Sequence, residues 1–329
     1  HELSSGSGSA FDMGHYSGRQ KWGAVCDEVY KRAYQSVNFL YQCQDDSTGW
    51  LSNYGSNDGA LFFKLNDCDY RDYRPQLDAL YYLLTSEHLY DRQYEDREWY
   101  LCEWKANRQM YPPIKKQFGC ISFDKGGYYC IREKDTFSFI RCGRHKDRPA
   151  HADNLHLDIW YQGENCLFDG GSYKYNTTEK LLRYFMGTES HNTIMLEGHD
   201  QMLKGDRFIW YNWSQAEWSS LKETEDTYIF EGKVSCFTYL NKKIKHYRKI
   251  VKWKNTCKWE IEDCIDGNPK NMNMRQLWHT NKDNLSLESN GETIDTEQLC
   301  SNYYGQTTKC RQIEFQTKNS SIKTILQFI

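Results

Sequence analysis

Histidine, aspartate and arginine gather in one stretch of this 329-residue chain, residues 144–193. The chain has ten histidines, and four of them fall within this stretch. Two imidazoles and a carboxylate that converge from separate strand ends are a natural ligand set for zinc. Each ligand also needs a partner that orients it, and Asp153, Ser190 and Asn192 are close enough in sequence to serve. We therefore expect the chemistry of the protein to lie here.

The spacing of these histidines matches none of the short zinc motifs, so spacing alone also allows ordinary core or surface histidines. The same stretch opens with Arg144-His-Lys-Asp-Arg148, which carries three fixed cations besides His145. Such a run is suited to docking a sulfate or carboxylate group. It is equally typical of a solvated basic turn.

The composition limits the class of protein. The formal net charge of -3 argues against a nucleic-acid partner, which calls for a basic excess. The aromatic share of 16% is suited to stacking on sugar rings, and also to a β-rich fold. No run of about 18 apolar residues occurs, so we expect no membrane insertion.

The compartment is left open by the sequence. Thirteen cysteines without CxxC pairs indicate reduced thiols and favour the cytoplasm. No signal peptide is visible, but the chain starts at His1 without Met, so we expect it to be a fragment.

Helices are expected in the first third of the chain. Apolar residues at helical spacing predict helices over 30–41 and 77–84, and a third over 94–105. The loop 50–59 between the first two is long and rich in Gly, Asn and Asp, which is typical of a functional loop. Residues 1–25 lack periodicity, and we expect them to be poorly ordered.

Strands are expected after the linker Tyr111-Pro-Pro113. Short β-branched and aromatic runs separated by turn residues predict strands at 127–132, 136–141, 155–161, 192–196, 207–213, 228–231, 245–253, 258–263 and 322–328. Many closely spaced strands without intervening helices favour a large antiparallel sandwich. We therefore predict two domains, 1–110 and 111–329.

Three motifs in this order resemble the C-terminal domain of the heparinase II/III-like family: His151-Ala-Asp-Asn-Leu-His-Leu-Asp158, Asp169-Gly-Gly-Ser-Tyr173 and Ser190-His-Asn-Thr193. Upstream, Asn53-Tyr-Gly-Ser-Asn-Asp-Gly-Ala60 and Tyr70-Arg-Asp-Tyr-Arg-Pro75 are similar to the end of the helical toroid of the same family. The resemblance spans residues 28–329.

The resemblance implies an α+β multidomain fold, in which a partial α/α toroid precedes a large antiparallel β-sandwich. It implies β-elimination of a uronate-containing acidic polysaccharide, whether heparan-type, alginate-type or capsular. It also implies a metal, usually zinc, held by His151, Asp169 and His191, which we interpret as structural. Removing either histidine is then expected to destabilise the sandwich. Family members are often periplasmic.

β-Elimination requires groups that neutralise the uronate carboxylate and groups that move protons. Carried over to this chain, the expected catalytic residues are Asn57, His145, His156 and Tyr173. The expected substrate-binding residues are Asp58, Arg74, Arg144 and Arg148. Two simpler interpretations stay open: Asn57-Asp-Gly59 as an ordinary turn, and an Asp72–Arg74 pair that caps the following helix.

The sequence departs from the family pattern in two places. Pro149 stands where the family commonly has a second sandwich histidine, so His145 or His156 is the expected replacement. The toroid Asn-His pair and the toroid Tyr of the family have no match before Asn57. A non-catalytic protein for glycan binding or polysaccharide assembly is therefore one alternative, and a zinc-dependent hydrolase is a second.

Overall fold

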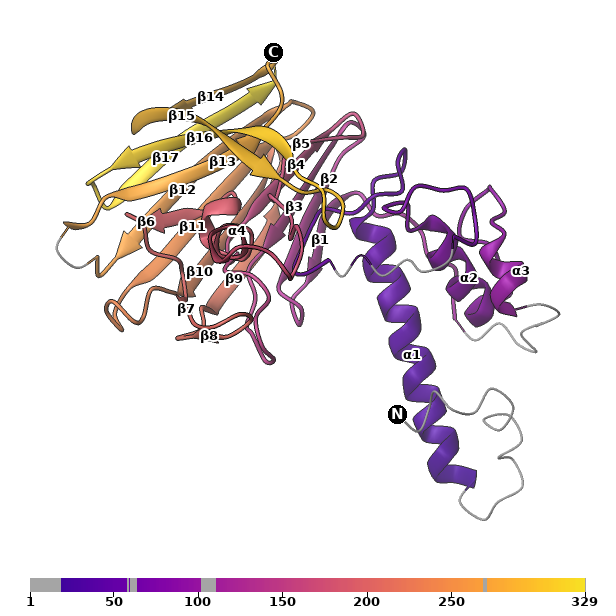
Figure 1. The fold of residues 1–329 in the computed structure, drawn as a ribbon. Helices are drawn as coiled ribbons and strands as arrows, with labels where there is room; N and C mark the ends of the chain where they lie inside the picture. The colour runs from indigo at the N-terminus through magenta and orange to yellow at the C-terminus, as the bar shows by residue number, and fades with distance from the viewer. Residues whose placement is uncertain (1–18, 58, 60–63, 102–110, 269–270, 329) are drawn as a thin grey trace. The chain divides into compact units, whose positions relative to one another are not determined.

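The computed structural model describes residues 19–57, 59, 64–101, 111–268 and 271–328 (Figure 1). The chain forms two compact units. The helical unit comprises residues 1–42 and 63–116, and the sandwich unit comprises residues 43–62 and 117–329. The segment 43–62, which we expected to join the helices, thus belongs with the strands. It is attached there by bonds such as that from the Trp160 indole nitrogen to Ser52 Oγ, 2.9 Å.

The helical unit contains α1 (Arg19–Cys43), α2 (Arg74–Thr85) and α3 (Asp96–Leu101). The last residue of α1, Cys43, belongs to the sandwich unit. α1 begins within the segment that we expected to be poorly ordered. α2 has proline in its first turn, where the missing amide hydrogen costs nothing. The predicted third helix is described only to Leu101, because residues 102–110 lie outside the described residues. Among the described helices, none combines the length and apolarity needed to span a membrane.

The sandwich unit is built from antiparallel sheets. In spatial order, the six-stranded sheet contains β14 (Leu285–Ser289), β17 (Ser321–Phe328), β12 (Lys258–Asp266), β11 (Lys245–Trp253), β10 (Thr227–Ser235) and β9 (Gln215–Glu223). The four-stranded sheet contains β15 (Glu292–Cys300), β16 (Thr308–Thr317), β13 (Met274–Thr280) and β6 (Ile194–Leu196). The five-stranded sheet contains β1 (Gly119–Phe123), β2 (Tyr128–Arg132), β3 (Thr136–Arg141), β4 (Leu157–Tyr161) and β5 (Glu164–Leu167).

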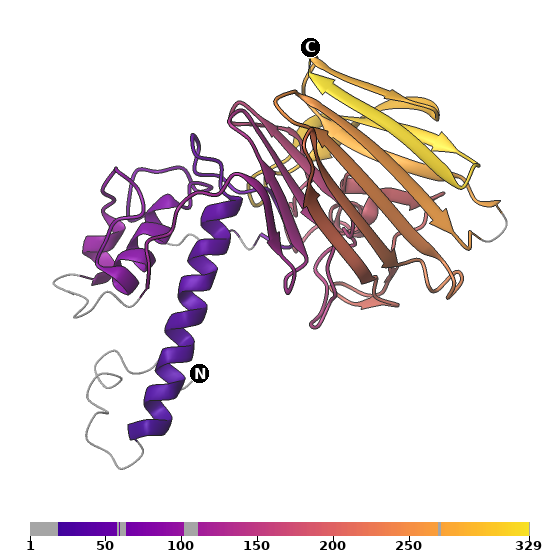
Figure 2. The ribbon, with the colours of Figure 1, turned by 180° about the vertical axis from the view of Figure 1, so that it is seen from behind.

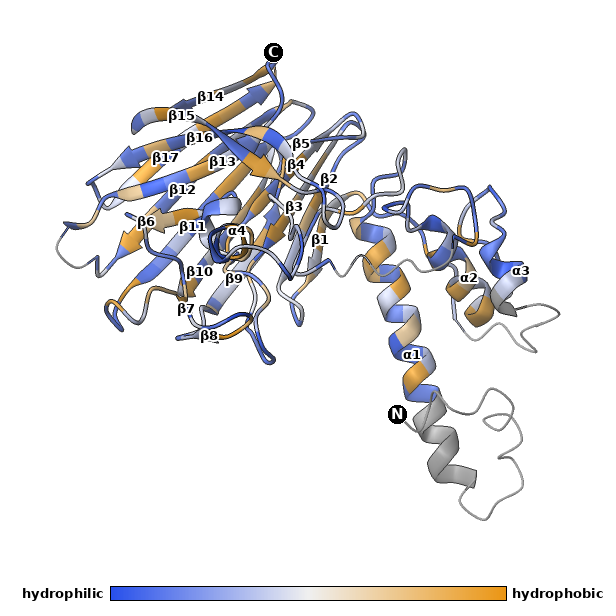
Figure 3. Cartoon of the chain, in the orientation of Figure 1, coloured by the Kyte–Doolittle hydropathy of each residue, from blue (hydrophilic) through white to orange (hydrophobic). Residues whose placement is uncertain are grey.

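One hydrophobic core unites these three sheets. Burial alternates residue by residue along β10, β11, β12 and β17, so each strand turns one face inward. The hydropathy also varies along these strands (Figure 3), but β11 buries His246, Arg248 and Lys252 as well as the apolar Ile250. Phe230 and Ile250 of the six-stranded sheet share the core with Ile140 of the five-stranded sheet and Trp278 of the four-stranded sheet. Figure 2 shows the six-stranded sheet from its outer side.

Smaller elements lie between the strands of the sandwich unit. α4 (Glu179–Met186) and the 3-10 helix η2 (Thr188–Ser190) follow β5 along the chain and precede β6. The Thr178 hydroxyl caps α4 by accepting the Leu181 amide hydrogen, 3.4 Å. A short hairpin, β7 (Leu203–Lys204) with β8 (Trp210–Tyr211), comes after β6.

Candidate metal centre and the adjoining cavity

Three loops bring His151, Asp169 and His191 together. His151 lies between β3 and β4, Asp169 follows β5, and His191 follows η2. One ligand atom from each side chain lies within 4.8 Å of the others. His191 Nε2 is 3.3 Å from His151 Nδ1 and 3.2 Å from Asp169 Oδ2. All three residues are at most 2% exposed, so the structure gathers the predicted ligands into one buried cluster.

The surrounding bonds orient two of these groups. His191 Nδ1 lies 2.7 Å from the carbonyl oxygen of Gly187, so it donates there and Nε2 faces the other two side chains. Asp169 Oδ1 accepts the amide hydrogen of Gly171, 2.7 Å, which leaves Oδ2 toward His191. In metal sites, hydrogen bonds of this kind fix the orientation of the ligand side chains.

The orienting partners differ in part from those expected. Ser190 Oγ does lie 3.2 Å from His191 Nδ1. Asp153 instead accepts a hydrogen bond from Arg141 Nε, 2.7 Å, and the Asn192 side-chain oxygen accepts one from the His279 amide, 2.8 Å. His279 is a fully buried histidine that was not expected at this site from the sequence.

The charges of the cluster favour a cation. Burial opposes ionisation of Asp169, but the adjacent His191 lowers the pKa of this carboxyl well below its usual range. Burial likewise opposes protonation of His191, yet Asp169 raises its pKa to about 8. Burial, and then the charge of His191, lowers the pKa of His151 to about 4. One proton is thus held between His191 and Asp169, where a metal ion would replace it.

The donor set fits zinc. Two imidazole nitrogens and one carboxylate oxygen are ligands that zinc takes. The His151 ring is neutral and turns Nδ1 toward His191 Nε2, 3.3 Å away, so its lone pair is directed into the cluster.

A cavity of about 320 Å³ opens beside His151. We call it the His151 cavity, and its lining includes Tyr54, Tyr128, Arg141, Arg144, His145, Arg148, His151 and Asp153. Tyr128 and Arg141 are directly opposite each other on β2 and β3. Arg141 donates to the Tyr128 hydroxyl, 2.7 Å, and is paired with Asp153. Neither Tyr128 nor Arg141 was proposed from the sequence, although strand alternation places both on one face.

His145 is a neutral group in this cavity. Burial, and then the Arg141 cation, lowers the pKa of His145 to about 4. Its Nδ1 lies 3.5 Å from an Arg141 nitrogen that can only donate, so Nε2 carries the hydrogen. That Nε2 has no partner among the residues that the structure describes.

The two predicted substrate-binding arginines of this loop, Arg144 and Arg148, make different contacts. Arg144 donates to the carbonyl oxygen of Ala216 on β9, 2.7 Å, so part of its role is to hold the loop. The Arg148 guanidinium lies 5.2 Å from the centre of the Phe208 ring and is otherwise exposed.

Two predicted catalytic residues of the sandwich unit lie away from the His151 cavity. His156 is 2% exposed, and its Nδ1 accepts the amide hydrogen of Asn192, 2.9 Å. Tyr173 packs on Phe185 with ring centres 5.6 Å apart. Neither residue lines the His151 cavity.

The predicted residues of the upstream loops also differ in placement. The Asn57 amide donates to Ser172 Oγ, 2.9 Å, and its side chain accepts from Gly59, 2.9 Å, which is the turn that we considered. Asp58 lies outside the described residues. Arg74 of the helical unit forms a two-bond pair with Asp72 at 2.8 and 2.7 Å, as in the capping interpretation.

Residues 116–317 match the family described as "Heparinase II/III-like, C-terminal". Among curated protein sequences, none matches significantly.

Solved structures with a similar fold carry heparinase names. A heparinase III aligns over 95% of this chain and 49% of its own, with 14% identity and a TM-score of 0.60. The heparan sulfate lyase HepC from Pedobacter heparinus aligns over 64% of this chain and 36% of its own, with 15% identity and a TM-score of 0.53. The chain thus spans less than half the length of these proteins, and the likeness establishes the fold. Because the family match covers well over half of the chain, this protein belongs to the heparinase II/III-like family.

Proposed function

We propose that this chain is a polysaccharide lyase-type protein that binds a uronate-containing acidic polysaccharide in the His151 cavity. The observation that carries the proposal is the lining of that cavity, where three arginines, a neutral histidine and the half-buried Tyr128 surround one space. Their chemistry matches the needs of β-elimination, in which C5 of a uronate loses a proton and C4 loses its oxygen.

The first need is to stabilise charge on the uronate carboxylate as C5 loses its proton. Arg144 and Arg148 offer positive charge, and the neutral His145 offers its Nε2 hydrogen. A neutral imidazole donor can stabilise a developing anion without giving up its proton.

The second need is a proton for the leaving oxygen on C4. The Tyr128 oxygen accepts a hydrogen bond from Arg141, and this bond uses a lone pair of the hydroxyl and not its hydrogen. Burial raises the pKa of Tyr128, which keeps the phenol protonated at neutral pH. In this proposal the C5 proton passes to a tyrosine or histidine side chain that acts as the base.

We assign zinc at His151, Asp169 and His191 a structural role. When bound, it supplies a charge that joins three loops. The burial of these side chains favours this role over a zinc-dependent hydrolase.

Glycan binding without cleavage is a second candidate. It is favoured by the positions of His156 and Tyr173, two predicted catalytic groups that do not line the His151 cavity.

The test is to mix the purified chain with heparan-type and alginate-type polymers. Binding is followed calorimetrically, and cleavage by the near-ultraviolet absorbance of the new C4–C5 double bond. Binding with rising absorbance supports the lyase proposal, and binding without it supports the second candidate. Failure to bind any uronate polymer contradicts both.

Two neighbouring tyrosines make a matched pair of variants. Tyr128→Phe should lower the cleavage rate by about 10²-fold, the size of a lost proton donor. Tyr129→Phe should leave the rate unchanged, because this hydroxyl points to the other face and bonds to Ser219 Oγ, 2.5 Å. Equal rates in the two variants contradict the role of Tyr128.

A further inference from the structure

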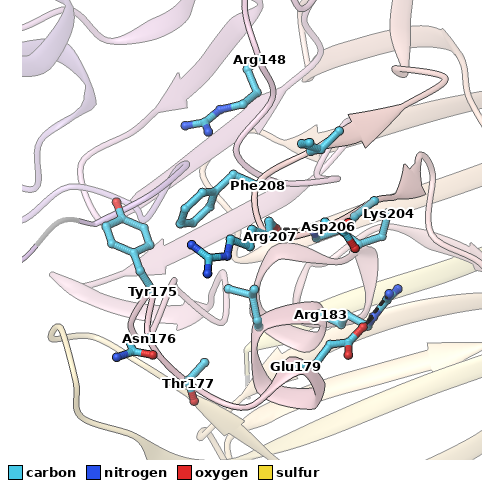
Figure 4. A pocket seen from close by; sticks show the side chains of 13 residues that line it. Arg148, Tyr175, Asn176, Thr177, Glu179, Arg183, Lys204, Asp206, Arg207 and Phe208 are labelled. Atoms are coloured by element: carbon cyan, nitrogen blue, oxygen red, sulfur yellow. Dashed lines mark hydrogen bonds and ion pairs between the residues drawn. The ribbon is translucent and has the colours of Figure 1, made fainter.

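A second and larger cavity, of about 950 Å³, lies beside α4 (Figure 4). We call it the α4 cavity. One side is formed by α4 and the preceding loop with Tyr175, and the other by the loop between β7 and β8 with Arg207 and Phe208. Arg148 lines both this cavity and the His151 cavity. The two spaces therefore meet at one arginine.

The charges that line the α4 cavity leave a positive excess. The lining includes four cationic side chains, Arg148, Arg183, Lys204 and Arg207, and two anionic side chains, Glu179 and Asp206. Arg183 is paired with Glu179 at 2.8 Å, and the Lys204 ammonium donates to the carbonyl oxygens of Gly205 and Arg207. Arg148 and Arg207 are exposed, and neither has an ionic partner among the described residues. These two guanidinium groups are thus available to an anion.

The same walls carry aromatic rings. Tyr175 and Phe208 meet edge to face, with ring centres 5.2 Å apart. Both are half-buried and face the cavity, as Figure 4 shows. Rings of this kind present flat apolar surface to the C–H face of a sugar. Arginines beside such rings are suited to a sugar unit that carries sulfate or carboxylate.

The loop that carries Arg207 is held in place before any ligand arrives. The Gly205 amide donates to the Ile209 carbonyl, 2.9 Å, and the Ile209 amide donates to the Asp206 carbonyl, 2.9 Å. The hairpin is fixed in turn by Trp210, whose indole nitrogen donates to the Ala150 carbonyl, 3.2 Å. Ala150 directly precedes His151, so this hydrogen bond joins the hairpin of the α4 cavity to the loop of the His151 cavity. A fixed loop lowers the entropy lost on binding.

We propose that the α4 cavity is a second subsite of the glycan cleft, which holds a sulfate- or carboxylate-bearing sugar unit of the chain whose uronate lies in the His151 cavity. This inference rests on the proposed function. Arg207 binds the anionic group of that distant unit, and Tyr175 and Phe208 contact its ring. Arg148 stands where the glycan passes from one cavity to the other.

The experiment measures the affinity of the intact chain for heparin-derived oligosaccharides of increasing length by calorimetry. Arg207→Ala should weaken binding of a long oligosaccharide roughly tenfold, the scale of a lost charge-assisted bond. The shortest oligosaccharide that binds should lose much less, because it fills the His151 cavity alone. Arg207→Lys keeps the charge but not the two-pronged geometry, so it should restore only part of the affinity.

The matched control is Arg311→Ala. This exposed arginine of β16 lines neither cavity, so the variant changes the net charge equally and should bind every oligosaccharide like the wild type. Equal affinities of wild type and Arg207→Ala for long oligosaccharides would overturn the subsite while leaving the proposed function intact. An equal loss in Arg311→Ala also overturns it, since net charge then explains the effect. No binding by the wild type contradicts the proposed function itself.

Discussion

Two buried carboxylates of the sandwich unit, Asp263 and Asp169, differ in how their charge is balanced. Asp263 on β12 accepts two bonds from Arg248, one from His246 and one from Gln276, each 2.7 Å long. Asp169 accepts one backbone hydrogen and otherwise faces His191. Both residues are at most 2% exposed. The charge of Asp263 is balanced by an arginine of the protein, whereas that of Asp169 is balanced only by a proton on His191.

The two clusters are also connected. Arg248 Nη1 donates to the carbonyl oxygens of Leu155 and Asn192, at 2.6 and 2.7 Å. Asn192 directly follows His191, and Leu155 lies in the loop of His151. The Asp263 cluster therefore positions the loops that carry His151 and His191. Its disruption should lower the free energy of unfolding more than removal of a bound metal would.

The largest effect is expected from Arg248→Met. It leaves a buried carboxylate without its cation, which costs about 3–5 kcal/mol of unfolding free energy. Arg311→Met is the matched control, because Arg311 and Asp295 pair at 2.6 Å with their side chains 44% and 47% exposed. It should cost about 1 kcal/mol or less. Urea unfolding measures both, and equal losses contradict the contrast between buried and exposed pairs.

A smaller effect is expected from pH in protein freed of metal by a chelator. Burial, and then His191, lowers the pKa of His151 from 6.5 to about 4. Between these values the unfolded chain binds a proton at His151 and the folded chain does not, so acid favours unfolding. As pH falls from 6.5 to 4, the wild type should therefore lose up to about 3 kcal/mol relative to His151→Asn. A constant difference between the two across this range contradicts a neutral buried His151.

The sequence predicted the sandwich best where burial alternates. The strand predicted over 245–253 coincides with β11, whose residues alternate between core and surface. β9 was not predicted, because it is mostly exposed and its sequence, QAEWSSLKE, lacks an apolar face. α4 was missed because only Phe185 and Met186 are buried in its eight residues. Its capping Thr178 and the Glu179–Arg183 pair were signals that could have revealed it.

The candidate site was predictable only in part, for a physical reason. His151, Asp169 and His191 come from three loops, so no local spacing joins them, and the family resemblance was needed to propose the set. The bonds of Arg141 with Tyr128 and of Arg248 with Asp263 depend on which residues face each other across strands. That register is set by the whole sheet. His156 was expected in the cleft but is buried, because its ring accepts the Asn192 amide hydrogen.

The most direct test of the account is a calorimetric titration of zinc into metal-free protein. We expect a single zinc ion per chain in the wild type, and none in Asp169→Asn, which keeps the shape of the side chain but removes the charge. Asp158→Asn, at an equally buried aspartate outside the triad, should bind zinc like the wild type. A wild type that binds no zinc, or an Asp169→Asn variant that titrates like it, would contradict the claim that these three side chains form one metal centre.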